Sequence, residues 1–177
     1  RAALGRFLRW HVANPRRLIG TEERFDAVVR LDDGEEVRLT GYADRLELDG
    51  DGNVVVVDLK TGRAKPSNKA VESHVQLGLY QFAVDHGALA ELAPNARAGG
   101  AELVHLGLLD GSEAAVVQAQ DAQPDDGPGR AALRDHVRRA AALLRAESFP
   151  AVAGQHCRDC SFVSICPIKS AGSVTNR

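Results

Sequence analysis

Residues 41–60, GYADRLELDGDGNVVVVDLK, contain two strand-like segments joined by a turn. The central DGDGN has the composition of a tight hairpin turn. The four consecutive valines that follow are typical of a strand buried on both faces. Upstream, residues 18–31 and 36–48 alternate between apolar and polar side chains, and Asp32-Asp33-Gly34 between them is a turn signal. The sequence therefore predicts a three-strand meander over residues 18–60.

Polar side chains are expected to meet where these strands end. Asp58 and Lys60 are two residues apart, so they project from the same face, while Leu59 points into the other layer. The hairpin can place Asp44 beside Asp58, and two facing carboxylates repel unless a cation lies between them. Such oxygen ligands select Mg²⁺ or Mn²⁺, and Lys60 could donate to a developing negative charge. The alternative is an ordinary Asp58–Lys60 ion pair with Asp44 exposed.

Helices and further strands are predicted around this meander, which gives an α/β or α+β fold with a mixed central sheet flanked by helices. A helix is expected from Ser67 or Asn68 to about His86, with Val71, Val75, Leu79 and Phe82 on its apolar face. The other expected elements are a helix over residues 2–13, a loop over 90–100, strands over 103–109 and 114–117, and a helix over 130–147.

Composition and charge limit the class of protein. The 177 residues are 44% hydrophobic and 26% charged, which is a globular balance. The longest apolar run, residues 140–144, is too short to span a membrane. A net charge of −2 does not indicate a strongly basic nucleic-acid binder, but the basic segment (residues 60–69, with Lys60, Arg63, Lys65 and Lys69) contains no acid and could still contact phosphates.

Three closely spaced cysteines, Cys157, Cys160 and Cys166, make the end of the chain distinctive. An odd number at this spacing does not indicate a disulfide framework; it indicates a metal or redox site in a reducing compartment, which we expect to be the cytoplasm. Three thiolates need a fourth ligand, either for zinc, with His156 as a candidate, or for an iron–sulfur cluster. Free thiols are the remaining reading. We expect a core over residues 1–150 and a cysteine segment over 151–177, a C-terminal cysteine-bearing loop.

Three motifs, GYADRLE, VVVDLKTG and QLGLYQFA, resemble in order those of the PD-(D/E)XK nuclease superfamily, best in its RecB-type branch. TEERF, with Glu22 and Phe25, resembles the segment that precedes them. The resemblance implies a restriction-endonuclease-like fold. It also implies that Asp44, Asp58 and the backbone carbonyl of Leu59 bind the metal, and that Lys60 is the catalytic lysine. Gln76 and Tyr80, which share a helix face, would orient Lys60 or touch DNA.

The branch also has an upstream histidine ligand and an iron–sulfur form. His11 has a setting unlike that motif, so the resemblance places the histidine before Arg1, in a part of the nuclease core outside this chain. In the iron–sulfur form, found in AddAB and AdnAB helicase–nucleases, three C-terminal cysteines join one far upstream. Cys157, Cys160 and Cys166 would then hold a [4Fe–4S] cluster that acts as a structural staple.

The resemblance as a whole implies a divalent-metal-dependent deoxyribonuclease domain, and it favours an exonuclease over an endonuclease. It would belong to a helicase–nuclease that acts in double-strand break repair and recombination. Its partners would be single-stranded DNA or DNA ends, a motor domain in the same polypeptide and a second subunit, with no membrane. The alternatives are a non-catalytic DNA-binding or scaffolding module of the same fold, and a stand-alone CRISPR-adaptation nuclease.

Overall fold

The computed structural model describes residues 1–32, 34–109 and 111–168, and its centre is a mixed five-stranded sheet in the order β1-β2-β3-β4-β5. The strands are β1 (Arg17–Arg30), β2 (Glu36–Leu48), β3 (Val54–Lys60), β4 (Ala98–His105) and β5 (Val116–Gln120). The helices are α1 (Ala2–Ala13), α2 (Asn68–Glu72), α3 (Val75–Asp85) and α4 (Pro128–Arg145), with a 3₁₀ turn η1 (Gln155–Asp159). The expected α+β class and the mixed, helix-flanked sheet are confirmed.

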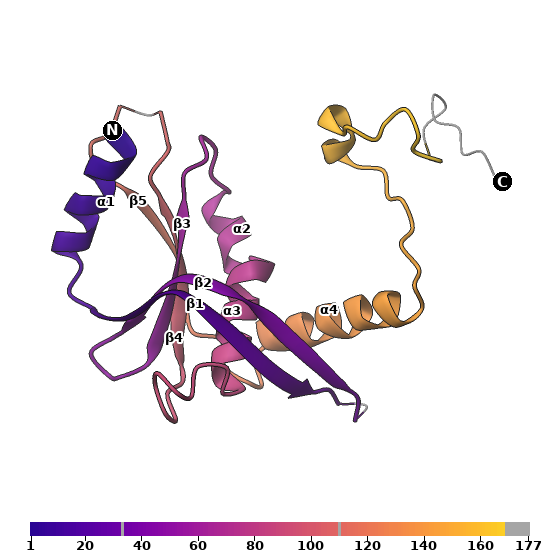
Figure 1. Ribbon diagram of the computed structural model, residues 1–177, viewed down its shortest axis with the longest axis horizontal. Helices are drawn as coiled ribbons and strands as arrows, with labels where there is room; N and C mark the ends of the chain where they lie inside the picture. Colours follow the sequence, from indigo (N-terminus) through magenta and orange to yellow (C-terminus); the bar gives the residue numbers. More distant parts are fainter. Residues whose placement is uncertain (33, 110, 169–177) are drawn as a thin grey trace. The chain divides into compact units, whose positions relative to one another are not determined.

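Strand pairing follows the expected meander and then changes direction (Figure 1). β1, β2 and β3 pair antiparallel, β3 and β4 pair parallel, and β5 returns antiparallel to β4. The parallel pair needs a crossover connection, and α2 and α3 provide it. This crossover places helices against one face of the sheet.

The valines of β3 face two different cores. Val54 and Val56 pack in the cluster that includes Leu77 of α3, whereas Val55 and Val57 pack in the cluster that contacts Phe7 of α1. The sheet is therefore covered by α3 on one face and by α1 on the other, as Figure 1 shows for the indigo N-terminal helix and the magenta helices. A strand buried on both faces explains why the run is wholly apolar.

The single helix expected from Ser67 or Asn68 to about His86 is wrong, because two helices lie there. α2 ends at Glu72, and α3 begins at Val75 after a break at Ser73 and His74. The break changes the buried face: Val75 is exposed, whereas Leu77 is fully buried. Ser67 does cap α2, since its hydroxyl accepts a hydrogen bond from the Ala70 amide at 3.2 Å.

The strand expected over residues 103–109 is also displaced. β4 begins at Ala98 and ends at His105, so part of the expected loop belongs to the sheet. Gly99 and Gly100 resemble a loop in sequence, but they form an irregularity in the ladder, because Val54 pairs with Ala98 and Val55 with Gly100. Gly100 has a φ of 120°, which favours glycine at this position.

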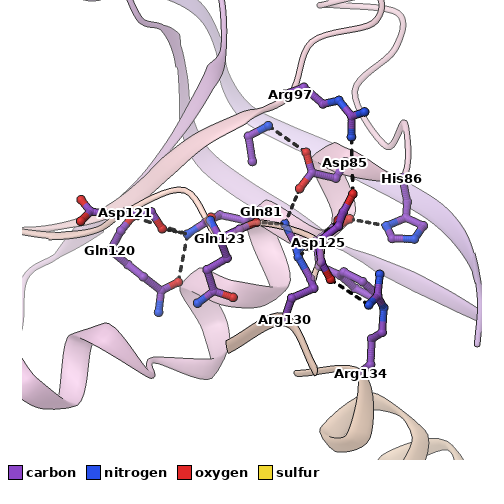
Figure 2. Close-up of polar contacts among 12 residues, drawn as sticks. Gln81, Asp85, His86, Arg97, Gln120, Asp121, Gln123, Asp125, Arg130 and Arg134 are labelled. Atoms are coloured by element: carbon purple, nitrogen blue, oxygen red, sulfur yellow. Dashed lines mark hydrogen bonds and ion pairs between the residues drawn. The ribbon is translucent and has the colours of Figure 1, made fainter. Parts of the chain in front are cut away.

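A buried ion pair fastens the start of α4 to α3. Arg130 has 0% of its surface exposed and bonds to Asp85, to the carbonyl of Gln123 at 2.9 Å, and lies over the Phe82 ring. Figure 2 shows Asp85 and Arg130 pointing toward one another, with Gln81 beside the chain at Gln123. A charge this deeply buried is tolerated because it is paired.

The chain divides into two units, residues 1–138 and 139–177. The first contains the sheet, and the second contains the end of α4 and η1. In the second unit Phe149, Phe162 and Ile165 are exposed. Among the helices of the described residues, none combines the length and apolar character needed to cross a membrane.

Candidate active site

The candidate site lies where β2 and β3 separate. Their ladder runs from Leu48 and Val54 to Arg45 and Val57 and ends there, so Asp44 and Asp58 come immediately after the last pair. The Leu59 amide donates a hydrogen bond of 2.8 Å to Asp44 Oδ2. The hairpin turn therefore brings the two aspartates to one place, as expected from the sequence.

β2 loses its regular alternation at the same point. Ala43 and Leu46 are three residues apart, yet both pack in the cluster that contacts α3. Across the ladder, Thr21 pairs with Arg45 and Glu23 with Ala43, so Glu22 lies between these pairs, and its φ of 52° is in the left-handed region. The distortion in both strands sets the backbone at Asp44 apart from a plain ladder.

Asp58 and Lys60 share a face, and their side chains meet. Asp58 is 4% exposed, and its Oδ2 lies 2.6 Å from Lys60 Nζ. Leu59 packs instead with the cluster on the α1 face. The geometric expectation for these three residues is confirmed. The Asp58–Lys60 ion pair, which the sequence also allowed as an ordinary structural contact, is present as well. Its ammonium group offsets the charge of a nearly buried carboxylate.

Gln76 and Tyr80 of α3 join this pair. The Gln76 side chain accepts from Lys60 Nζ at 3.2 Å through Oε1, and it donates to Asp58 Oδ1 at 3.1 Å through Nε2. The same Nε2 lies 3.0 Å from the Tyr80 hydroxyl. Gln76, with Tyr80 four positions later on the same helix, therefore holds both Asp58 and Lys60 at the end of β3. These four residues, Asp58, Lys60, Gln76 and Tyr80, are called the strand-end cluster below.

The Tyr80 hydroxyl lies deep in the strand-end cluster. It is 3.3 Å from the Tyr42 carbonyl and 3.4 Å from Asp58 Oδ1. Burial, together with the nearby charge of Asp58, raises the pKa of Tyr80 to about 12. Tyr80 is therefore a hydrogen-bond donor at any physiological pH. The contact with the Tyr42 carbonyl could not be expected from the motif.

The donor set has the chemistry of a hard-cation site, although it is small. Asp58 Oδ2 is buried and meets the Lys60 ammonium at 2.6 Å, so a cation would bind this oxygen in place of the ammonium. Asp44, Asp58 and the Leu59 carbonyl would supply only oxygen ligands, which suit Mg²⁺ or Mn²⁺. Among residues 1–32, 34–109 and 111–168, no group of three His, Cys, Asp or Glu side chains is arranged to hold a metal. The chemistry of Asp44 and Asp58 therefore suits a small hard-cation site with two carboxylates.

The residues ahead of the motifs divide between the two faces of the sheet. The Phe25 ring packs edge-on against the Tyr80 ring, with centroids 5.9 Å apart, so it buttresses the strand-end cluster. His11 lies on the α1 face, with Nδ1 3.1 Å from Arg45 Nη2. It is not grouped with Asp44 and Asp58, as its sequence setting led us to expect.

The α1 face of β2 carries a buried charge network that the sequence did not reveal. Burial of Glu47 opposes its ionisation, but hydrogen bonds from Asn14, Arg45 and Arg16 outweigh this effect and lower its pKa. Arg16 also bonds to Glu102 of β4, at 2.6 and 2.8 Å. The network joins the segment after α1 to the strand that carries Asp44.

The three cysteines lie in the second unit. Cys157 is in η1, Cys160 is its C-terminal flanking residue, and all three are half-buried, free thiols. The Gly154 amide lies 3.4 Å from Cys157 Sγ. The thiols are therefore accessible, and they fit the cysteine-bearing loop expected near the C-terminus.

The fold and the candidate site combine a mixed sheet with two aspartates and a lysine, located where β2 and β3 separate and beside the Gln–Tyr pair of α3. The family model of the PD-(D/E)XK nuclease superfamily matches residues 1–167. The chain belongs to this superfamily.

Similarity to individual proteins is more remote. The crystal structure of SSO0001 superposes with a TM-score of 0.57 and 17% sequence identity, over 94% of this chain and 67% of that chain. At this identity the likeness concerns the fold. No curated protein matches the chain.

Proposed function

We propose that this chain is the nuclease domain of a RecB-type helicase–nuclease that hydrolyses DNA phosphodiesters with Mg²⁺ or Mn²⁺. The observation that carries the proposal is the strand-end cluster, in which Lys60 and Gln76 contact a nearly buried Asp58 beside Asp44. Superfamily membership supports nuclease chemistry. The RecB-type assignment depends on the three motifs and on the cysteines.

Each residue has a definite task in the proposed reaction. Asp44, Asp58 and the Leu59 carbonyl would hold the cation, which would polarise the phosphate and favour ionisation of the attacking water. Lys60, once released from Asp58, donates to the scissile phosphate, where negative charge develops. Gln76 keeps the ammonium in place through its Oε1, which lies 3.2 Å from Nζ. Tyr80 orients Gln76 and Asp58.

The rest of the proposal concerns the complete protein. We propose an exonuclease that acts on single-stranded DNA or DNA ends delivered by a motor domain in the same polypeptide, with a second subunit, in the cytoplasm. Cys157, Cys160 and Cys166 would hold a [4Fe–4S] cluster with an upstream cysteine, because three half-buried thiols at this spacing need one more ligand.

The test is the Asp58→Asn variant of the natural full-length protein. It keeps the shape of the side chain but removes a charge that the cation needs, so we expect Mg²⁺-dependent cleavage of labelled DNA to fall by about 10²-fold or more, the scale of losing one preorganised group. The matched control is Asp51→Asn, an exposed hairpin aspartate, which should cut as well as the wild type. Undiminished cleavage by purified Asp58→Asn would overturn the catalytic assignment. DNA binding without cleavage by the wild type would favour a non-catalytic module.

A further inference from the structure

The basic segment lies on the surface and has little apolar anchorage. Residues 61–70 are exposed apart from half-buried Pro66, and Val71 is the first fully buried side chain after Lys60. A mobile loop of lysines and arginines would lose conformational entropy on binding a phosphate backbone. A device that holds the segment in advance would therefore favour binding.

Polar side chains of β5 hold the segment in this way through hydrogen bonds. Gln118 Nε2 donates to Asn68 Oδ1 at 2.7 Å and to the Pro66 carbonyl at 3.1 Å. Two residues later on the same face, Gln120 Nε2 donates to the Val71 carbonyl at 2.9 Å. Both glutamine side chains are buried, so the bonds of Gln118 to the basic segment and of Gln120 to Val71, just beyond it, are at least partly shielded from water.

His105 links this device to the catalytic strand. Its Nε2 is 2.9 Å from Gln118 Oε1. Because the Gln118 amide nitrogen already donates twice, its Oε1 is the acceptor, and His105 Nε2 must carry the proton. His105 is 2% exposed and pairs with Lys60 in the parallel ladder between β3 and β4. The chain Lys60–His105–Gln118–Asn68 thus connects the catalytic lysine to the segment that follows it.

We propose that His105 and Gln118 are positioning residues that hold the basic segment ready to grip the phosphodiester backbone of the DNA substrate. The inference rests on the proposed function, since it assumes that DNA approaches Lys60. Neither side chain touches the substrate; each acts through the backbone of Pro66 and the side chain of Asn68. A purely structural role for this pair would affect stability alone.

In the full-length protein, two variants interrupt this series of hydrogen bonds, one at His105 and the other at Asn68. His105→Leu removes the donor to Gln118, and Asn68→Ala removes an exposed acceptor without disturbing the core. His105→Gln should rescue, because its amide can still donate to Gln118 Oε1. Val29→Ala, in the core at the far end of β1, is the control for simple loss of stability.

We expect His105→Leu and Asn68→Ala to raise KM for DNA by about three- to tenfold with little change in kcat, the scale of one lost hydrogen bond. The slope of log Kd against log salt should fall by about 1, as for one lost phosphate contact. Amide hydrogen exchange of residues 66–74 should quicken in both variants, while Val29→Ala should leave exchange there, KM and slope unchanged.

Other outcomes separate the two proposals. Faster exchange with unchanged KM and salt slope, or a fall in kcat alone, would overturn the positioning role. Unchanged exchange would show that the polar chain does not hold the segment. If the wild type neither binds nor cuts DNA, the proposed function fails, and exchange still reports whether His105 anchors the segment.

Discussion

At the scale of single residues, Tyr80 shows how burial fixes a protonation state. Its hydroxyl lies between Gln76, Asp58 and the Tyr42 carbonyl, and its pKa is raised to about 12. A group that stays protonated can orient a carboxylate but cannot act as a base at neutral pH. Its role is therefore geometric.

Tyr80→Phe removes the hydroxyl and keeps the ring against Phe25. We expect kcat to fall by about tenfold, the equivalent of one buried hydrogen bond, with KM little changed. A pH titration followed by tyrosinate absorbance should show an ionisation near pH 12 in the wild type that is missing from Tyr80→Phe. Ionisation of Tyr80 near pH 10, or an unchanged kcat, would contradict this role.

The residue pattern also shows what a sequence can predict about this site. Two-residue spacing placed Asp58 and Lys60 on one face, and four-residue spacing placed Gln76 and Tyr80 together, because both follow from backbone geometry. The links to the Tyr42 carbonyl and from His105 to Gln118 join distant parts of the chain, so local spacing cannot predict them. One signal in the sequence pointed toward these contacts: Gln118 and Gln120 occupy alternate positions of a short strand and therefore share one face of it.

At the scale of elements, β2 carries different chemistry on its two faces. Asp44 accepts a hydrogen bond from the Leu59 amide at the candidate site, whereas Arg45 and Glu47 join the buried network with Arg16. Because the pKa of Glu47 is lowered in the folded chain, the unfolded chain binds more protons near and below its ordinary value of 4.5. The stability that Glu47 contributes is therefore complete above that pH and is lost as the pH falls below it.

Glu47→Gln should lower the free energy of unfolding by about 2–3 kcal/mol at pH 7, because it leaves arginine charges less well paired in a buried site. The difference in the free energy of unfolding between wild type and variant should become smaller as the pH falls from 5 toward the lowered pKa of Glu47. Urea unfolding at a series of pH values measures it. A gap that is constant across this range would show that the charge of Glu47 does not stabilise the fold.

Local pattern predicted α1 and β2 with their observed ends, since both have clear periodicity and clear breaks. It failed at Ser73 and His74, where no glycine or proline marks the break between the two helices. There the amide nitrogen of Gln120 lies within hydrogen-bond distance of the carbonyls of Val71, Glu72 and His74 and donates to them. This distant side chain adds to the local backbone bonds at the break, such as the one from the Gly78 amide to the His74 carbonyl, and a sequence window does not contain it.

At the scale of the whole molecule, the second unit exposes much of its large apolar surface. Phe149, Phe162 and Ile165 are exposed in it. A metal centre shared with an upstream cysteine would order such a segment, because ligand binding and folding are coupled.

Anaerobically purified full-length protein should therefore be brown and contain about four iron atoms per chain. Cys160→Ala should lose the iron and melt at a lower temperature. His156→Ala is the matched control, since an iron–sulfur cluster does not need it and a zinc site could. Stoichiometric zinc that is lost in His156→Ala would replace the cluster with a zinc site.

The parallel pairing of β3 with β4 also affects the order of folding. The β1–β2–β3 meander closes through neighbouring hairpins, but Lys60 pairs with His105 only after both crossover helices have been made. Contacts between distant segments form slowly because a long loop must close first. Asp58 lies beyond the β2–β3 ladder and pairs with Leu103 of β4, so a nascent chain would fix Asp58 and Lys60 together, after the meander that contains Asp44. We expect cleavage competence to arise at a late step of folding, which would protect nucleic acids near the ribosome from a half-made nuclease.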